Sequence, residues 1–167
     1  MKYVRFTIFF IFIILGACST STSTPYPSNL QPVYVDTVGN FDYTSLKYNL
    51  QKSLLSYDIK LTNIKNEAKT ILTIKKIENS EEVITKKNLT STQNYFVKKL
   101  YKVNFGLQFP TLKTNNNFKL SSSSPTLIIN NTNAFSKIDF DETKNELENE
   151  IVYKIVSKVR SNAGKKI

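Results

Sequence analysis

The chain has 167 residues, 40% of them hydrophobic, which is enough for one globular domain and too few for two. It carries 23 Lys and Arg residues against 13 Asp and Glu, a net charge of +10, so its partners are expected to be anionic. It contains no histidine and only one cysteine, Cys18. This excludes an internal disulfide, a zinc site of the usual ligands and Cys/His or Ser/His/Asp catalysis, and we therefore expect no enzymatic activity, no metal and no cofactor.

The pattern of residues 1–17 is that of a secretory signal peptide. Lys2 and Arg5 precede an apolar run at positions 6–15, which is shorter than the roughly 20 apolar residues that span a bilayer. The sequence Leu-Gly-Ala-Cys that ends at Cys18 resembles the lipobox of bacterial lipoproteins, so we expect Cys18 to become the acylated first residue. The alternative is a small residue beside an ordinary signal-peptidase site. The residue after the cysteine is serine, and the resemblance then implies sorting to the outer membrane.

A segment of low complexity follows the signal peptide. Residues 18–32 are rich in Ser, Thr and Pro, which predicts a lipidated N-terminus and a flexible tether. Folding is expected to begin after Pro32, so that residues 33–167 form one periplasmic domain. Without the signal peptide the chain keeps 21 basic and 13 acidic residues, and its net charge is +8.

The first half of this domain shows one helix signal between strand signals. The β-prone residues 33–37 predict a first strand. Residues 44–57 predict an amphipathic helix, because leucine recurs every four residues, and the hydroxyl of Thr44 or Ser45 is expected to cap it. The alternation at 57–61 and the β-prone run at 71–77 are interpreted as two further strands.

The clearest strand signal covers residues 95–109. Aromatic and aliphatic side chains share one parity there and polar side chains take the other, apart from Lys99 and Leu100, which indicates one core face and one solvent face. Residues 118–120 and 126–130 predict one further β-segment at a sheet edge, because a serine run and Pro125 interrupt it.

The chain ends with a helix signal. The apolar face consists of Leu147, Ile151, Val152, Ile155 and Val159. The spacing of Asp139 and Glu142 resembles a capping box, and Gly164 is expected to end the helix. Acidic residues at this N-terminus suit the helix dipole better than a metal ion. The element order predicts a small single α+β domain, with a mostly antiparallel sheet of about four strands and two helices packed on one face.

Basic and aromatic residues are interleaved between positions 75 and 102, a pattern that also occurs in proteins that bind single-stranded nucleic acid. The export signal argues against that partner, because a periplasmic lipoprotein meets lipopolysaccharide phosphates instead. We therefore expect no nucleic-acid partner. The alternative for each lysine is an ordinary solubilising position on a strand face.

Taken together, the chain resembles the lipopolysaccharide-assembly lipoproteins, the LptE (RlpB) family, over nearly all of the expected domain. The resemblance rests on the lipobox at Cys18, the strand at 33–37 that runs into a helix, the tetrapeptide at 92–95 that opens a long strand, and the tripeptide at 135–137 before the last helix. It implies a subunit without enzymatic activity that plugs the outer-membrane β-barrel LptD, assists its assembly and contacts lipopolysaccharide.

The same resemblance implies the positions that contact lipopolysaccharide phosphates: Lys137 before the last helix, and Lys86 and Lys87 in the hairpin before residue 92. The sequence departs from the family at the serine run 121–124 and at the serine-rich tether. Two other functions stay open: a periplasmic scaffold or secretion-apparatus adaptor that binds a protein partner, and a lipid-anchored enzyme.

Overall fold

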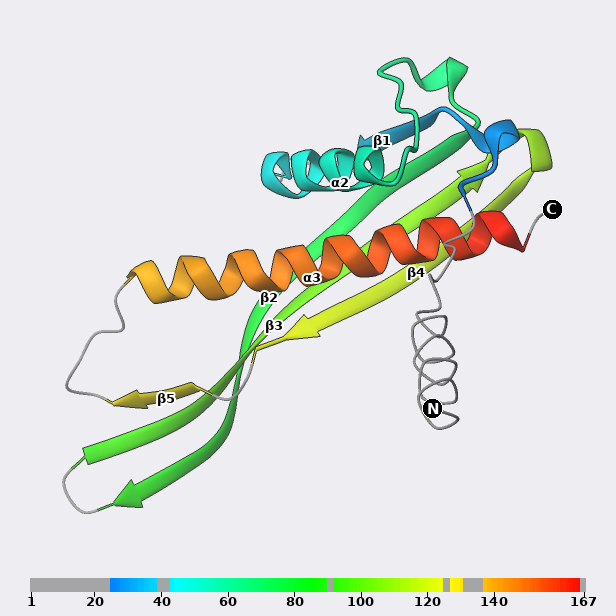
Figure 1. The fold of residues 1–167 in the computed structure, drawn as a ribbon. Helices are drawn as coiled ribbons and strands as arrows, with labels where there is room; N and C mark the ends of the chain where they lie inside the picture. Colours follow the sequence, from blue (N-terminus) through cyan, green and yellow to red (C-terminus); the bar gives the residue numbers. More distant parts are fainter. Residues whose placement is uncertain (1–24, 39–42, 90–91, 125–126, 131–136, 166–167) are drawn as a thin grey trace, which may run out of the picture.

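The computed structural model describes residues 25–38, 43–89, 92–124, 127–130 and 137–165. Five strands form one sheet in the order β1-β2-β3-β4, and β5 also pairs with β3 (Figure 1). The strands are β1 (Val33–Thr37), β2 (Thr70–Leu89), β3 (Thr92–Phe109), β4 (Thr114–Ser123) and β5 (Leu127–Asn130), and the helices are α2 (Thr44–Ser56) and α3 (Lys137–Gly164). Short 3-10 turns lie at Ser28–Leu30, Lys65–Glu67 and Pro110–Leu112.

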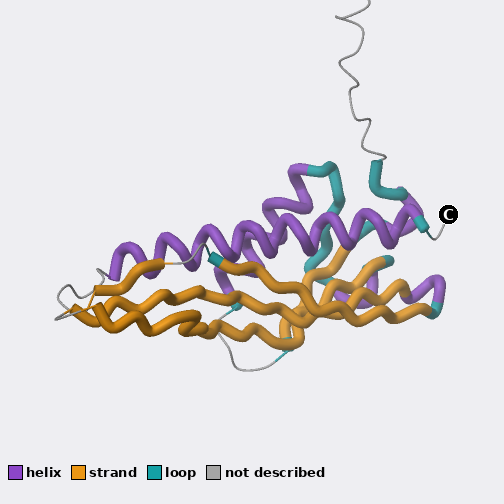
Figure 2. Tube along the Cα trace, turned by 90° about the horizontal axis from the view of Figure 1, so that it is seen from below, coloured by secondary structure: helices purple, strands orange, loops and turns teal. Residues whose placement is uncertain are grey.

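The sheet is mixed. β1 runs parallel to β2, and the other pairs are antiparallel. α3 lies along one side of the sheet and packs against β3, β4 and α2 (Figure 2). The predicted small α+β domain, with a mainly antiparallel sheet and both helices on one face, is confirmed. Among the described residues, no helix is long and apolar enough to span a membrane.

One hydrophobic core joins the sheet and the two helices. Leu46, Leu50 and Leu54 of α2 are buried in it, as the four-residue spacing predicts. The odd-numbered residues from Tyr101 to Phe109 are also buried there, which confirms the predicted parity of β3. The apolar face predicted for the last helix contributes Leu147, Ile151, Val152, Ile155 and Val159.

Several local predictions were wrong. Residues 57–61 form no strand: Tyr57 is the C-cap of α2, and a single bridge joins Leu61 to Val33. The N-cap of α2 is Tyr43, whose side chain makes no capping hydrogen bond. The Ser45 hydroxyl donates to Glu148 at 2.7 Å instead of capping the helix. α3 begins at Lys137, before the predicted capping box.

The predicted interrupted edge segment is two separate strands. β4 pairs with residues 100–109 of β3, whereas β5 pairs with residues 94–97. The first three serines of the run end β4, Ser124 follows the strand, and the run attaches this edge to its neighbours. The Ser121 carbonyl accepts a hydrogen bond from Lys154, the Ser122 hydroxyl donates to Glu150, and the Ser124 hydroxyl accepts one from the Lys99 N–H.

The folded domain begins earlier than predicted. Tyr26 is only 6% exposed and Leu30 is also buried, so at least residues 25–32 pack on the domain instead of forming the tether. The Thr70 hydroxyl donates to the Leu30 carbonyl at 2.9 Å, which leaves its oxygen to accept the Tyr26 hydroxyl at 2.8 Å. Two apolar side chains within a Ser/Pro-rich composition therefore fix the start of the domain.

The buried phenol predicts a loss of stability in alkali. Burial raises the pKa of Tyr26 to about 12, above its usual value near 10. The unfolded chain therefore releases this proton first, so the stabilisation is complete below pH 10 and is lost as the pH rises toward 12. Two pKa units correspond to about 2.7 kcal/mol, an upper limit for this side chain.

We expect the free energy of unfolding, measured by urea titration, to fall by about 2 kcal/mol between pH 9.5 and 11.5 through Tyr26 alone. Tyr26→Phe is the matched control, because it keeps the ring and removes the ionisable group. Its stability should fall less steeply over this pH range. Equal slopes for the two proteins would contradict the prediction.

Candidate functional site

The predicted lysines lie at the end of the molecule where β2 and β3 extend furthest. Lys86 and Lys87 lie near the end of β2, and Lys87 pairs with Asn94 of β3, which pairs in turn with Asn130 of β5. Seven residues later Lys137 begins α3 (Figure 1). The topology thus brings the three backbone positions to one end, while their side-chain contacts lie outside the described part of the structure.

This end is an arm of the sheet. We define the arm as residues 81–89 of β2 and 92–99 of β3, beyond the residues of β3 that pair with β4. At about 3.3 Å per residue, the 20 residues of β2 cover roughly 66 Å. The arm therefore extends far beyond the core and presents its tip at a distance from the rest of the domain.

The N-terminal segment enters at the opposite end. Tyr26 contacts Thr70, the first residue of β2, and the Arg160 guanidinium near the end of α3 lies 4.5 Å from the centre of the Tyr57 ring. Cys18 lies outside the described residues, seven positions before Pro25. A lipid at Cys18 would hold this end near the membrane and leave the arm to reach away from the attachment point.

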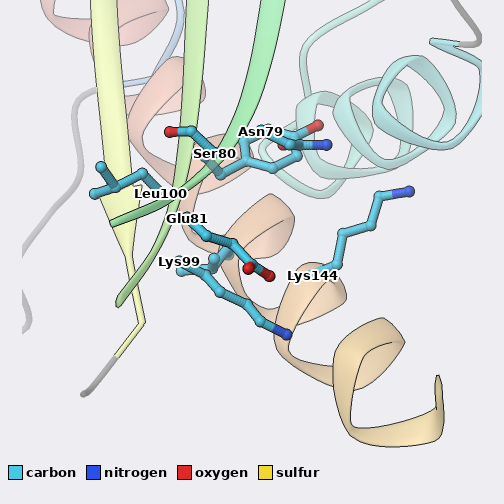
Figure 3. A pocket seen from close by; sticks show the side chains of 8 residues that line it. Asn79, Ser80, Glu81, Lys99, Leu100 and Lys144 are labelled. Carbon is cyan, nitrogen blue, oxygen red and sulfur yellow. The ribbon is translucent and has the colours of Figure 1, made fainter. Parts of the chain in front are cut away.

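A groove of about 230 Å³ lies where the arm leaves the core (Figure 3). Buried Tyr101 and Leu147 form part of its wall, and Figure 3 shows Glu81, Lys99 and Lys144 at the same groove. One carboxylate and two ammonium groups leave little net charge there. The groove is lined by Asn79, Ser80, Glu81, Lys99, Leu100, Tyr101, Lys144 and Leu147.

Beside this groove, a buried carboxylate links three elements. Glu148 of α3 is 4% exposed and accepts hydrogen bonds from Ser45 at 2.7 Å, Asn49 at 2.8 Å and Tyr101 at 3.5 Å. Burial, and then the charge of Glu148, raises the pKa of Tyr101, so its hydroxyl stays protonated as a donor. All three donors are neutral. Because Ser45 and Asn49 lie on α2 and Tyr101 lies on β3, their hydrogen bonds to Glu148 position α2 and β3 against α3.

Sequence analysis assigned no role to Glu148. A signal was present: Glu148 precedes Ile151, Val152 and Ile155 by three, four and seven positions, so it shares their helix face. Within the described part of the chain, no group of three or more acidic, cysteine or histidine residues could hold a metal ion.

No protein-family model matches the sequence, and no curated protein matches it. Solved structures match the fold. A minor lipoprotein from Acinetobacter baumannii is 12% identical, with a TM-score of 0.57 over 78% of this chain and 92% of that chain. Rare lipoprotein B from Shewanella oneidensis is 12% identical, with a TM-score of 0.51 over 80% of this chain and 95% of the other.

The same fold also occurs in a protein with a different description. A neuraminyllactose-binding hemagglutinin homolog from Helicobacter pylori is 10% identical, with a TM-score of 0.57 over 85% of this chain and 92% of that chain. At these identities the likenesses concern the fold alone. The chain therefore shares its architecture with solved bacterial proteins of more than one description, among them two lipoproteins.

Proposed function

We propose that the protein is a lipid-anchored outer-membrane subunit of the lipopolysaccharide-transport complex, which plugs the LptD β-barrel, assists its assembly and binds lipopolysaccharide. The observation that carries this proposal is the fold shared with rare lipoprotein B over 95% of that chain. The lipobox ending at Cys18 supports it, because a lipid anchor would place the domain at the outer membrane, where the proposed barrel lies.

The shape and polarity of the domain also support this function. The lumen of an outer-membrane barrel is polar, and a domain that occupies it must present polar surface on several sides. Among the described residues, no helix covers the second face of the sheet (Figure 2). On β4, the exposed side chains are Asn115, Asn117, Lys119 and Ser121. The extended arm would reach along such a lumen.

The test is recovery of the barrel. After gentle detergent extraction of the tagged full-length chain, we expect LptD at a ratio of one to one. Depletion of the protein should lower the amount of correctly assembled barrel and make the outer membrane leaky. Cells that keep normal barrel and normal surface lipopolysaccharide after depletion would reject the proposed function.

Lysines at the arm and at the start of α3 are expected to bind the phosphates of lipopolysaccharide. Charge-assisted hydrogen bonds contribute about 1.5–3 kcal/mol each, so Lys137→Asp combined with Lys87→Asp should weaken binding by the purified protein at least tenfold at low salt. Binding is measured at low and physiological ionic strength, because salt screens exposed charges beyond about 8 Å. Lys86→Asp, tested separately, shows whether the third candidate contributes.

The control is the pair Lys52→Asp and Lys158→Asp, which changes the charge equally at exposed positions of α2 and α3. This variant should bind lipopolysaccharide nearly as the unchanged protein does. If the Lys137/Lys87 variant keeps a native circular dichroism spectrum and full binding at low salt, these lysines are not the site.

A second function is a protein-binding scaffold or secretion adaptor at the outer membrane. The likeness to the hemagglutinin homolog favours it, because the same fold there carries a different description. Recovery of a defined envelope complex without LptD would support the scaffold. Turnover of a substrate by the isolated protein would instead support a lipid-anchored enzyme.

A further inference from the structure

We propose that the helix-free face of the sheet is a docking surface for an acidic protein wall. This inference rests on the proposed function, since it names the surface through which the domain would contact the barrel. The surface comprises four lysines and one glutamate on three neighbouring strands, and we call it the basic face: Lys75, Lys76, Lys102, Lys119 and Glu78.

Strand register brings these side chains together. Lys76 pairs with Asn104, which pairs with Lys119, while Glu78 pairs with Lys102 on the next outward-facing rung. Phe105 and Phe118 point to the core, so alternation places their neighbours Asn104 and Lys119 on the opposite face. With strands about 4.8 Å apart, this puts lysines from β2 and β4 roughly 10 Å from one another.

Lys75 is held in place on this face. It is the extra residue of a β-bulge, because Ile74 pairs with Phe105 and Lys76 with Asn104. Its ammonium donates to the Asn117 side chain on β4 at 2.7 Å. The side chain crosses over Gly106, where an added Cβ would lie 3.1 Å from Lys75 Cε. The bulge and Gly106 together allow the Lys75 side chain to extend across β3 to β4.

The basic face has more cations than its own carboxylate neutralises. Lys76 and Glu78 form an ion pair at 2.5 Å. The pKa of Glu78 is lowered by the hydrogen bond and charge of Lys76, with smaller contributions from the charges of Lys119 and Lys102. Three lysines thus surround one carboxylate, Lys75 adds a fourth cation, and the face has a net charge of +3.

The chemistry of the face fits a protein wall better than a membrane surface. Neutral amides and hydroxyls separate the lysines, among them exposed Asn115, Asn117 and Ser121, and these groups hydrogen-bond readily to polar side chains. Membrane-surface elements usually add apolar side chains that enter the acyl boundary. Within residues 70–82, 98–109 and 114–123 of these three strands, no large apolar side chain is exposed. Complementary charge would orient the domain in its partner.

The experiment reverses three charges in the full-length lipidated chain: Lys76→Glu, Lys102→Glu and Lys119→Glu. The matched control makes the same change at Lys52, Lys60 and Lys158, which are exposed on α2, a loop and α3. Both variants must keep a native circular dichroism spectrum. We expect the first to recover at least tenfold less LptD than the unchanged protein, and the control to stay within twofold.

A second measurement separates this inference from the identity of the barrel. Lysines are acetylated in isolated outer membranes and in the purified protein, and the modified peptides are quantified. We expect Lys76, Lys102 and Lys119 to react at least fivefold more slowly in the membrane, with less protection at the control lysines. If the unchanged chain recovers no LptD but shows this protection, the proposed function fails and the docking surface stands.

Two results would overturn the docking surface. One is equal acetylation of the three lysines in membranes and in purified protein, since no partner then covers the face. The other is loss of binding to phosphatidylglycerol vesicles by the reversed variant while its LptD recovery matches that of the control variant. That result would mean that the basic face binds anionic lipid and not a protein wall.

Discussion

Replacing Phe105 with alanine is expected to lower the free energy of unfolding by about 3–5 kcal/mol. Phe105 is fully buried in β3, pairs with Ile74 of β2 and Phe118 of β4, and stacks on the Phe118 ring at a centroid distance of 5.1 Å. Truncation removes apolar contacts on three strands at once and leaves a cavity in the core between the sheet and the helices. Urea unfolding followed by far-ultraviolet circular dichroism measures the change.

Two controls locate this effect in the core. Phe105→Leu keeps most of the buried volume and should cost well under half as much as alanine. Tyr153→Ala, at a side chain 64% exposed on α3, should change stability by about 0.5 kcal/mol or less. A loss below about 1 kcal/mol for Phe105→Ala would mean that this part of the sheet is not packed as described.

The parts of the fold that the sequence predicted well depend on local periodicity. The alternation in β3 and the four-residue leucine spacing in α2 both match the burial in the structure. Each pattern reports which side of one element faces the core, and that information is contained within the element. The layers of the fold follow, since each apolar face needs a partner.

Predictions that depended on pairing between distant segments were less accurate. Residues 57–61 alternate as a strand would, but Ile59 is buried from a loop, and only Leu61 forms a bridge. Alternation shows a preference for burial, whereas a strand also needs a partner along its length. The same reason explains β4 and β5: the sequence shows an interruption but not which part of β3 each segment pairs with.

The basic face shows the same limit for a functional surface. Lys75, Lys76 and Lys102 were visible in the sequence within one basic stretch, but Lys119 joins them only through the register of β3 with β4. The sequence does not predict the bulge at Lys75 either, because the residues around it have the pattern of a regular strand. The candidate residues Lys86, Lys87 and Lys137 were predicted from the family resemblance. The structure adds that their backbone positions lie at the same end of the molecule.

Replacing Cys18 with serine is expected to abolish acylation and remove the protein from the outer-membrane fraction. A serine hydroxyl does not replace the thiol that the lipobox presents, so the lipoprotein peptidase should leave the precursor uncleaved. Each buried methylene contributes about 0.8 kcal/mol to membrane binding, so loss of the acyl chains removes far more than any other single substitution considered. The measurements are palmitate labelling, precursor size on gels and separation of the two membranes.

The control for this prediction is Ser19→Ala, which should be labelled, processed and sorted like the unchanged protein. Ser19→Asp should keep the palmitate label but move the protein to the inner membrane, because aspartate after the cysteine resembles a retention signal. These variants separate lipidation from sorting, since the first requires Cys18 and the second depends on its neighbour. Palmitate label that persists in Cys18→Ser would show that the anchor has been assigned to the wrong residue.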